Sequence, residues 1–204
     1  MKRKIRGTVL VALGLTMIFS AVSMFAVYER EAEVAGENAQ LLLEELRTEM
    51  ESIQTPPASA QTPAEEPQKN TMVQTTLAGY DLVGILRIAS IGLELPILNS
   101  WDYDLLKISP CRYSGSIQDG NLILLGHNYK RHFAPLKKLS AGDKIVFQTV
   151  DGTEYSYKVA EKEVLQKTEL ERLTASEYDL TLFTCTNGGY SRLTIRCDRI
   201  LDEI

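Results

Sequence analysis

Histidine, tryptophan and cysteine are scarce in this chain of 204 residues, which contains two, one and three of them respectively. Histidine is the side chain that ordinarily titrates near neutral pH, so His127 and His132 alone can supply an imidazole acid or base. Paired Cys-x-x-Cys motifs and carboxylate-rich loops are both missing. The sequence therefore predicts no metal site, and we expect no cofactor.

Basic residues are also fewer than acidic residues. The chain has 22 basic and 27 acidic residues, for a formal net charge of −5. It has no cluster of basic and aromatic residues, which is the usual footprint of nucleic-acid binding. We therefore exclude nucleic acid as a main partner.

Only one long apolar run occurs, over residues 8–27. At 1.5 Å per residue a helix of this length spans about 30 Å, the thickness of one hydrocarbon core. Basic residues precede the run and acidic residues follow it, so the positive-inside rule predicts a single-pass anchor with its N-terminus in the cytoplasm. The alternative is a signal peptide cleaved near Ala21-Val22-Ser23, but the run is longer than the usual apolar core of such peptides.

Composition divides the chain into four segments. We expect a basic cytoplasmic tail over residues 1–7 and a transmembrane signal anchor over 8–27. Residues 28–71 combine a helix rich in leucine and glutamate with a proline-rich linker. That helix is predicted to be a membrane-proximal stalk, with self-association as the alternative. Residues 72–204 remain for one extracellular catalytic domain with its own core.

Short strands dominate the predicted domain. Segments of alternating or β-branched residues predict strands over 82–88, 93–98, 121–125, 144–148, 154–159, 180–185 and 192–200. Short helices are expected over 103–108, 133–139 and 168–173. The domain is therefore predicted to be mainly β.

Cys185 and Arg192 stand at facing ends of two predicted strands. The residues between them include Asn187-Gly188-Gly189, a strong tight-turn signal. An antiparallel hairpin would bring the thiol and the guanidinium to the same edge of the sheet. Arg196 shares the strand face with Arg192, but it would lie roughly 13 Å further along the strand. The alternative for this face is a solvated row of basic residues.

Of the two histidines, His127 is the better candidate for the acid or base. Gly126 ends the apolar segment 121–125 immediately before it, which aims the imidazole from a strand end into a cleft. His132 lies among polar and aromatic residues, where a helix start or a surface position is expected. No carboxylate that would orient His127 is evident from the sequence.

These three residue types suit acyl transfer. A cysteine thiolate is the nucleophile, and a neighbouring cation must depress its pKa from about 8.5 for much of it to exist near neutrality. His127 can give a proton to a leaving amine and take one from an incoming amine. Arg192 stays charged, so its role would be to stabilise the oxyanion of a tetrahedral intermediate.

The motif Thr181-Leu182-Phe183-Thr184-Cys185, with Arg192 downstream and Leu125-Gly126-His127-Asn128 upstream, resembles the sortase family of Gram-positive cell-surface cysteine transpeptidases. The resemblance covers about residues 80–200. It implies a closed eight-stranded β-barrel with His127, Cys185 and Arg192 as catalytic residues. It also implies that Cys185 cleaves a sorting signal with a Leu-Pro-x-Thr-Gly-like motif and forms a thioester.

By the same resemblance, the partners would be surface proteins with a C-terminal sorting signal and an amine of a peptidoglycan precursor or of another protein. Calcium dependence, seen in some sortases, is an untested exception to the expected absence of metal. A second hydrophobic segment and an Asp-Pro-aromatic lid are both missing, which disfavours pilus polymerisation. A class B-like or class D-like enzyme is expected. Substrate-binding residues cannot be assigned individually, although segment 161–177 is expected to contribute.

Two other function classes stay open. One is a membrane-tethered cysteine peptidase, in which water rather than an amine resolves the thioester. The other is a non-enzymatic surface module in which Cys185 is structural or binds zinc together with Cys197 and His127. Cys111 and Cys197 could form a disulfide, but Cys197 falls on the predicted inward face, where a buried thiol is equally expected.

Overall fold

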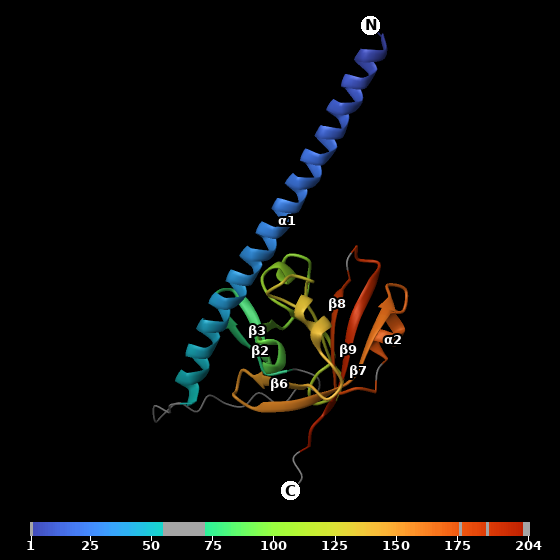
Figure 1. Cartoon of the computed structure of the whole chain (residues 1–204). Helices are drawn as coiled ribbons and strands as arrows, with labels where there is room; N and C mark the ends of the chain where they lie inside the picture. Colours follow the sequence, from blue (N-terminus) through green and yellow to red (C-terminus); the bar gives the residue numbers. More distant parts are fainter. Residues whose placement is uncertain (1, 55–71, 176, 187, 202–204) are drawn as a thin grey trace.

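A long helix stands beside a β-barrel in the computed structural model, which describes residues 2–54, 72–175, 177–186 and 188–201 (Figure 1). Helix α1, Lys2–Gln54, is continuous through the predicted anchor and the predicted stalk. The predicted proline-rich linker and Asn187 of the predicted turn lie outside the described residues.

The sheet contains nine strands in the order β1-β2-β3-β4-β5-β8-β9-β7-β6, and β2 also pairs with β6. The strands are β1 (Thr75–Leu77), β2 (Tyr80–Ile88), β3 (Leu93–Leu98), β4 (Cys111–Ser114), β5 (Leu122–Leu125), β6 (Lys144–Thr149), β7 (Glu154–Gln166), β8 (Leu180–Cys185) and β9 (Ser191–Arg199). Strand β1 is added to the start of β2, and the other eight close on themselves through the β2–β6 pairing. The predicted closed eight-stranded barrel is therefore confirmed.

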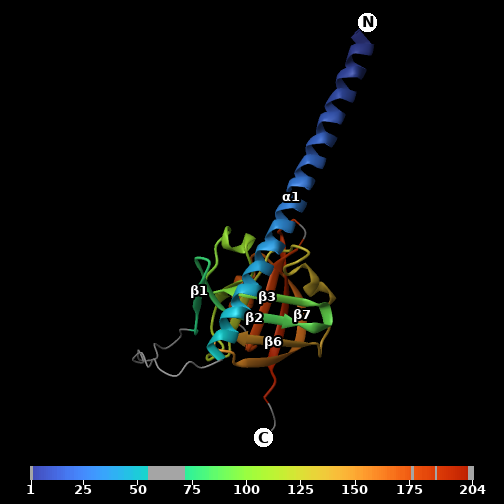
Figure 2. The same cartoon turned by 90° about the vertical axis from the view of Figure 1, so that its left-hand side faces the viewer.

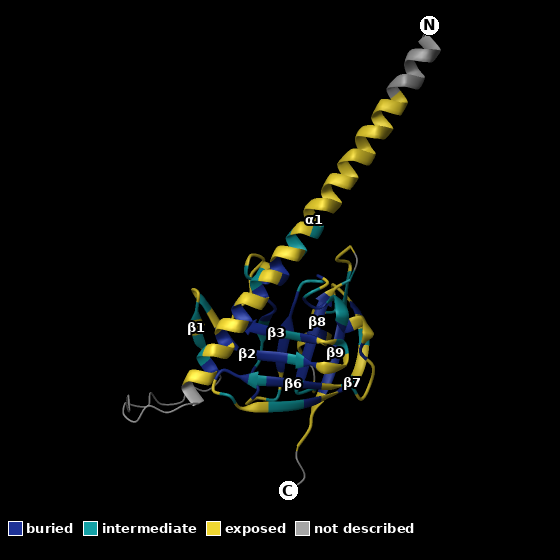
Figure 3. Ribbon diagram, turned by 60° about the vertical axis from the view of Figure 1, so that its left-hand side comes forward, coloured by how far each residue is buried: buried dark blue, intermediate teal, exposed yellow. Residues whose placement is uncertain are grey.

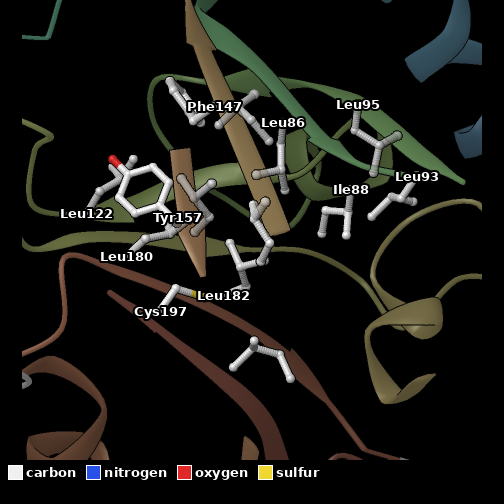
Figure 4. Packing of buried hydrophobic residues seen from close by; sticks show 14 of the residues in the cluster. Leu86, Ile88, Leu93, Leu95, Leu122, Phe147, Tyr157, Leu180, Leu182 and Cys197 are labelled. Atoms are coloured by element: carbon white, nitrogen blue, oxygen red, sulfur yellow. The ribbon is translucent and has the colours of Figure 1, made fainter. Parts of the chain in front are cut away.

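Alternate side chains of the strands point inward and fill the barrel interior. Leu180 and Leu182 of β8 point into the inner apolar cluster, whereas Phe183 belongs to a second cluster on the outer face. Phe147 and Tyr157 are at most 1% exposed and pack with the leucines inside the barrel (Figure 4). The barrel is thus a filled core, and any site must lie at its edges or on its outer face.

Short helices occur close to the three predicted places. They are η2 (Leu105–Lys107), η3 (Ala134–Lys138) and α2 (Leu170–Thr174), of which the first two are 3₁₀ turns. A further 3₁₀ turn, η1 (Ala89–Ile91), was not predicted, nor were β1 and β4. Strand β7 is longer than predicted, because a register shift between Val159 and Glu161 lets it continue along β9.

The second half of α1 packs against the outside of the barrel, across β2 and β3 (Figure 2). Its buried side chains recur at helical spacing: Ala35, Ala39, Leu42, Leu43, Leu46 and Met50. The leucines and Met50 share one cluster with Leu82, Ile85 and Leu98 of the barrel. The segment predicted to be a stalk therefore lies along the domain over much of its length.

The first half of α1 extends beyond the barrel, and its described side chains are exposed (Figure 3). Leucine, valine, methionine and phenylalanine side chains between Leu10 and Val27 are all more than half exposed. By length and composition this part of the helix can cross a membrane.

We expect Leu46→Ala to lower the free energy of unfolding by about 2–3 kcal/mol, because a fully buried leucine is removed from the helix–barrel contact. Leu41→Ala is the matched control, since Leu41 lies in the same helix and is 63% exposed. Denaturant unfolding of the full chain in detergent, followed by fluorescence of the single tryptophan, measures both. Equal stabilities of the two variants would contradict the packing of α1 on the barrel.

Candidate active site

Strands β5 and β8 run parallel, and their carboxyl ends meet at one edge of the barrel. Leu125 pairs with Phe183, and the Gly126 amide donates to the Phe183 carbonyl at 3.2 Å. His127 and Cys185 each follow this pair by two residues. The register therefore brings the predicted imidazole and thiol to the same strand edge.

Arg192 reaches that edge from the neighbouring strand. Strands β8 and β9 are antiparallel, and Cys185 is the direct partner of Arg192 in their register. The connection is closed by the Thr186 amide, which donates to the Ser191 carbonyl at 2.8 Å. Gly188 and Gly189 have φ values of 88° and 72°, which glycine adopts without strain. The structure thus brings all three predicted residues together.

Cys185 is exposed, whereas His127 and Arg192 are half-buried. An open hollow of about 290 Å³ adjoins the cysteine, and its lining includes Asn128, Ala134, Lys137 and Leu193. The lining comes from the His127 loop, from η3, and from the facing ends of β8 and β9. The expected contribution of segment 161–177 to substrate binding stays a prediction. An extended peptide lying in this hollow would pass beside the thiol.

Close packing around Gly126 fixes the start of the histidine loop. A Cβ at this position would lie 2.7 Å from the ring of Phe133, which is fully buried. The His127 ring lies against Tyr129, with centroids 4.7 Å apart and an interplanar angle of 30°. Burial lowers the pKa of His127, the charge of Glu31 opposes that shift, and Lys107 adds to it.

The contact of His127 with Tyr129, and the link from Tyr129 to Glu31, were not predicted. Tyr129 stacks on the imidazole and donates its hydroxyl to Glu31 of α1 at 3.2 Å. Tyr129 stands two residues from His127, but nothing in the sequence indicates that a side chain of α1 reaches this loop. Glu31 is therefore a carboxylate whose charge acts on His127, and its hydrogen bond is to Tyr129 rather than to the imidazole.

The alternative of a solvated basic face on β9 does not hold for Arg196. Its side chain is 3% exposed and forms an ion pair with Glu163 at 3.0 Å. It also donates to the carbonyls of Leu173 and Arg172 and to the hydroxyl of Thr181. Because these acceptors occupy its guanidinium, Arg196 is a structural residue, and Arg192 is the arginine available at the open edge.

His132 is also not where we expected it, because it is fully buried under α1. Its Nε2 lies 3.3 Å from the carbonyl of Ala35, and a carbonyl can only accept, so Nε2 carries the proton. Burial lowers the pKa of His132 to about 4. His132 is therefore a neutral packing residue between the loop and the helix.

The remaining cysteines are buried free thiols. Burial raises the pKa of Cys111 to about 12 and also raises that of Cys197. Cys197 points into the inner cluster and lies five residues beyond Arg192, roughly 17 Å along the strand. A zinc site shared by Cys185 and Cys197 is incompatible with this separation, and the residues described here contain no group of three or more metal-binding side chains.

An exposed thiol beside a histidine and an arginine at the edge of a closed barrel defines a class, the β-barrel cysteine enzymes. The sortase domain family model matches residues 86–200, which is more than half of the chain. The chain therefore belongs to the sortase family and is a cysteine transpeptidase of the sortase type. No curated protein sequence matches it significantly.

Solved sortases share the fold. Sortase C1 from Streptococcus agalactiae is 26% identical with a TM-score of 0.52, covering 59% of this chain and 68% of that one. Clostridium perfringens sortase C, solved with the C-terminal cell wall sorting motif, is 23% identical with a TM-score of 0.54 over 81% and 90%. Sortase A from Corynebacterium diphtheriae is 21% identical with a TM-score of 0.52 over 61% and 63%. The expected class B-like or class D-like assignment stays a prediction.

We expect Arg196→Lys to lower the free energy of unfolding by about 2–3 kcal/mol, because lysine cannot satisfy the four acceptors and leaves Glu163 poorly paired. Arg192→Lys, on the same strand face, should leave stability within about 0.5 kcal/mol of the parent. Denaturant titrations of both variants measure the difference. A destabilised Arg192→Lys beside an unaffected Arg196→Lys would reverse the two assignments.

Acid should weaken the structure through His132. Its pKa is lowered in the folded chain, so the unfolded chain binds the extra proton first, and stability falls as the pH drops from about 6.5 towards 4. The effect is on the order of 3 kcal/mol at full protonation. His132→Gln should show a smaller loss of unfolding free energy between pH 7 and pH 4 than the parent. An identical loss in both proteins would contradict this role of His132.

Proposed function

We propose that His127, Cys185 and Arg192 are the catalytic residues of a transpeptidase that cleaves sorting-signal peptides of the Leu-Pro-x-Thr-Gly type. The observation that carries the proposal is the pairing of an exposed Cys185 with Arg192, in register with His127 across β5 and β8. Membership of the sortase family supports the same chemistry.

In the first half-reaction the Cys185 sulfur attacks the scissile carbonyl carbon, and the resulting oxyanion is stabilised by the guanidinium of Arg192. Protonated His127 gives its proton to the leaving amine as the carbon–nitrogen bond breaks, which leaves a thioester. In the second half-reaction neutral His127 takes a proton from the incoming amine, and the Cys185 thiolate is expelled. One new amide bond replaces the one that was cleaved.

We propose that residues 8–27 anchor the enzyme in the cell membrane, with residues 1–7 in the cytoplasm and the barrel outside. The catalytic edge then lies close to the membrane surface, because the loop after His127 contacts α1 just beyond the apolar run. The Tyr28 hydroxyl donates to the Asn128 carbonyl at 3.4 Å, and Glu29 pairs with Lys130 at 2.7 Å. Domain 72–204 carries the site, and the second half of α1 lies on it.

A site at this height suits substrates that are themselves held at the membrane. Surface proteins with a C-terminal sorting signal fit this description, and so does the amine of a peptidoglycan precursor. The cell wall sorting motif in the Clostridium perfringens sortase C structure supports the first substrate class. The enzyme would then anchor surface proteins to the cell wall.

The test uses the full chain in detergent with a library of sorting-signal peptides and a glycine-based amine, analysed by mass spectrometry. We expect ligated products that disappear in Cys185→Ala. Arg192→Lys should reduce kcat by roughly 10²- to 10³-fold, because lysine lacks the planar fork that holds an oxyanion. Hydrolysed peptide alone, despite added amine, would favour the peptidase, and full activity of Cys185→Ala would remove Cys185 as the nucleophile.

A further inference from the structure

We infer that the part of α1 just beyond the membrane anchor, residues 28–40, is a positioning element of the active site, with Glu31 and Tyr129 setting the orientation of His127. This inference rests on the proposed catalytic role of His127. It makes the anchor helix a part of the site as well as a tether.

The whole loop from Asn128 to His132 is held by α1. Asn128 accepts from Tyr28, Tyr129 donates to Glu31, and Lys130 pairs with Glu29. Further along, Arg131 donates to Gln40, and His132 donates to the Ala35 carbonyl. Five consecutive loop residues thus make five separate polar contacts with one helix, so the loop is attached to α1 along its whole length.

Tyr129 transmits this attachment to the imidazole. It is 5% exposed, and its ring contacts those of His127 and Tyr28, with centroid distances of 4.7 Å and 5.6 Å. The hydroxyl bond to Glu31 fixes the tyrosine ring from its far end. Because the rings of Tyr129 and His127 are only 30° from parallel, the tyrosine limits the tilt of the imidazole.

The helix also sets the charge around His127. Glu31 from α1, Lys107 from η2 and His132 from its own loop act on its charge, and the Tyr129 ring lies against it. Cys185 of β8 and Arg192 of β9 stand at the same edge of the barrel. Glu31 favours the imidazolium, whereas burial and Lys107 disfavour it. The first half-reaction needs the imidazolium, so the carboxylate supports the form that burial depletes.

Helix and loop are fitted closely to each other. Gly36 is buried against Arg131, and a Cβ at this position would overlap the arginine side chain. The glycine lets the helix backbone approach the loop. The contact, which extends from Tyr28 to Gln40, is therefore built over about three turns of α1 and does not depend on the Glu31–Tyr129 bond alone.

Glu31→Gln in the full chain tests the inference, with Glu33→Gln as the matched control. Glu33 lies two residues away in the same helix and is exposed, so the control makes the same charge change without the tyrosine contact. The chain has two histidines, so NMR of imidazole-labelled protein in detergent, with His132→Gln for assignment, reports the titration of His127 directly. Activity is measured by the peptide-ligation assay.

We expect Glu31→Gln to move the His127 titration to lower pH and to reduce kcat roughly three- to tenfold, with little change in KM. Tyr129→Phe keeps the stacked ring but loses the tether, and it should reduce kcat several-fold. Glu33→Gln should change neither quantity.

Three results would overturn the inference. An unchanged His127 titration in Glu31→Gln, or an equal shift in Glu33→Gln, would show that Glu31 does not act on the imidazole. A shifted titration with unchanged kcat, while His127→Ala is inactive, would show that Glu31 contributes nothing to positioning. Full activity of His127→Ala would remove the proposed role of His127 itself, and the titration would still report the Glu31 contact separately.

Discussion

The parallel pairing of β5 with β8 is the constraint on which the rest of the site depends. Parallel strands cannot be joined by a tight turn, so the chain between Leu125 and Leu180 must cross back, and it builds β6, β7 and α2 on the way. Only when this pairing is made do His127 and Cys185 reach one edge. The Cys185–Arg192 pair, in contrast, follows from a local hairpin. The site therefore joins one local contact to one that requires the whole barrel.

This difference explains how much the sequence could predict. Period-two patterns and the glycines after Cys185 located β8, β9 and their hairpin, and the Gly126-His127 pair marked the end of β5, because these signals are local. The burial of Arg196 could not be predicted, since strand alternation does not tell which face α2 covers. The prediction of a surface or helix-start position for His132 was wrong for the same reason, because its partner Ala35 is 97 residues away in the sequence. Leucine and glutamate along α1 are equally typical of a free stalk and of a docked helix.

Helix α1 meets two requirements in one uninterrupted element. The exposed side chains of residues 10–27 are mostly apolar, which would suit a lipid environment, and the second half of the helix packs apolar residues against the barrel. The change occurs at residues 28–31, where Tyr28, Glu29 and Glu31 meet the histidine loop. In the proposed orientation a continuous helix holds the catalytic edge at a fixed height, within about 6 Å of helix rise from the end of the apolar run.

Arg192 and Arg196 lie on one strand face, and they differ in how deeply their guanidinium groups are buried. Arg196 is enclosed by Glu163, the end of α2 and Thr181, and removing Glu163 would leave its buried charge unpaired. Arg192 lies four residues away at the strand edge, half-buried and level with the exposed thiol. An oxyanion site requires a cation whose donors are not already taken. Hydrogen bonds from Arg196 to the carbonyls of Arg172 and Leu173 hold α2 over this face, whereas Arg192 stands at the strand edge, paired in register with Cys185.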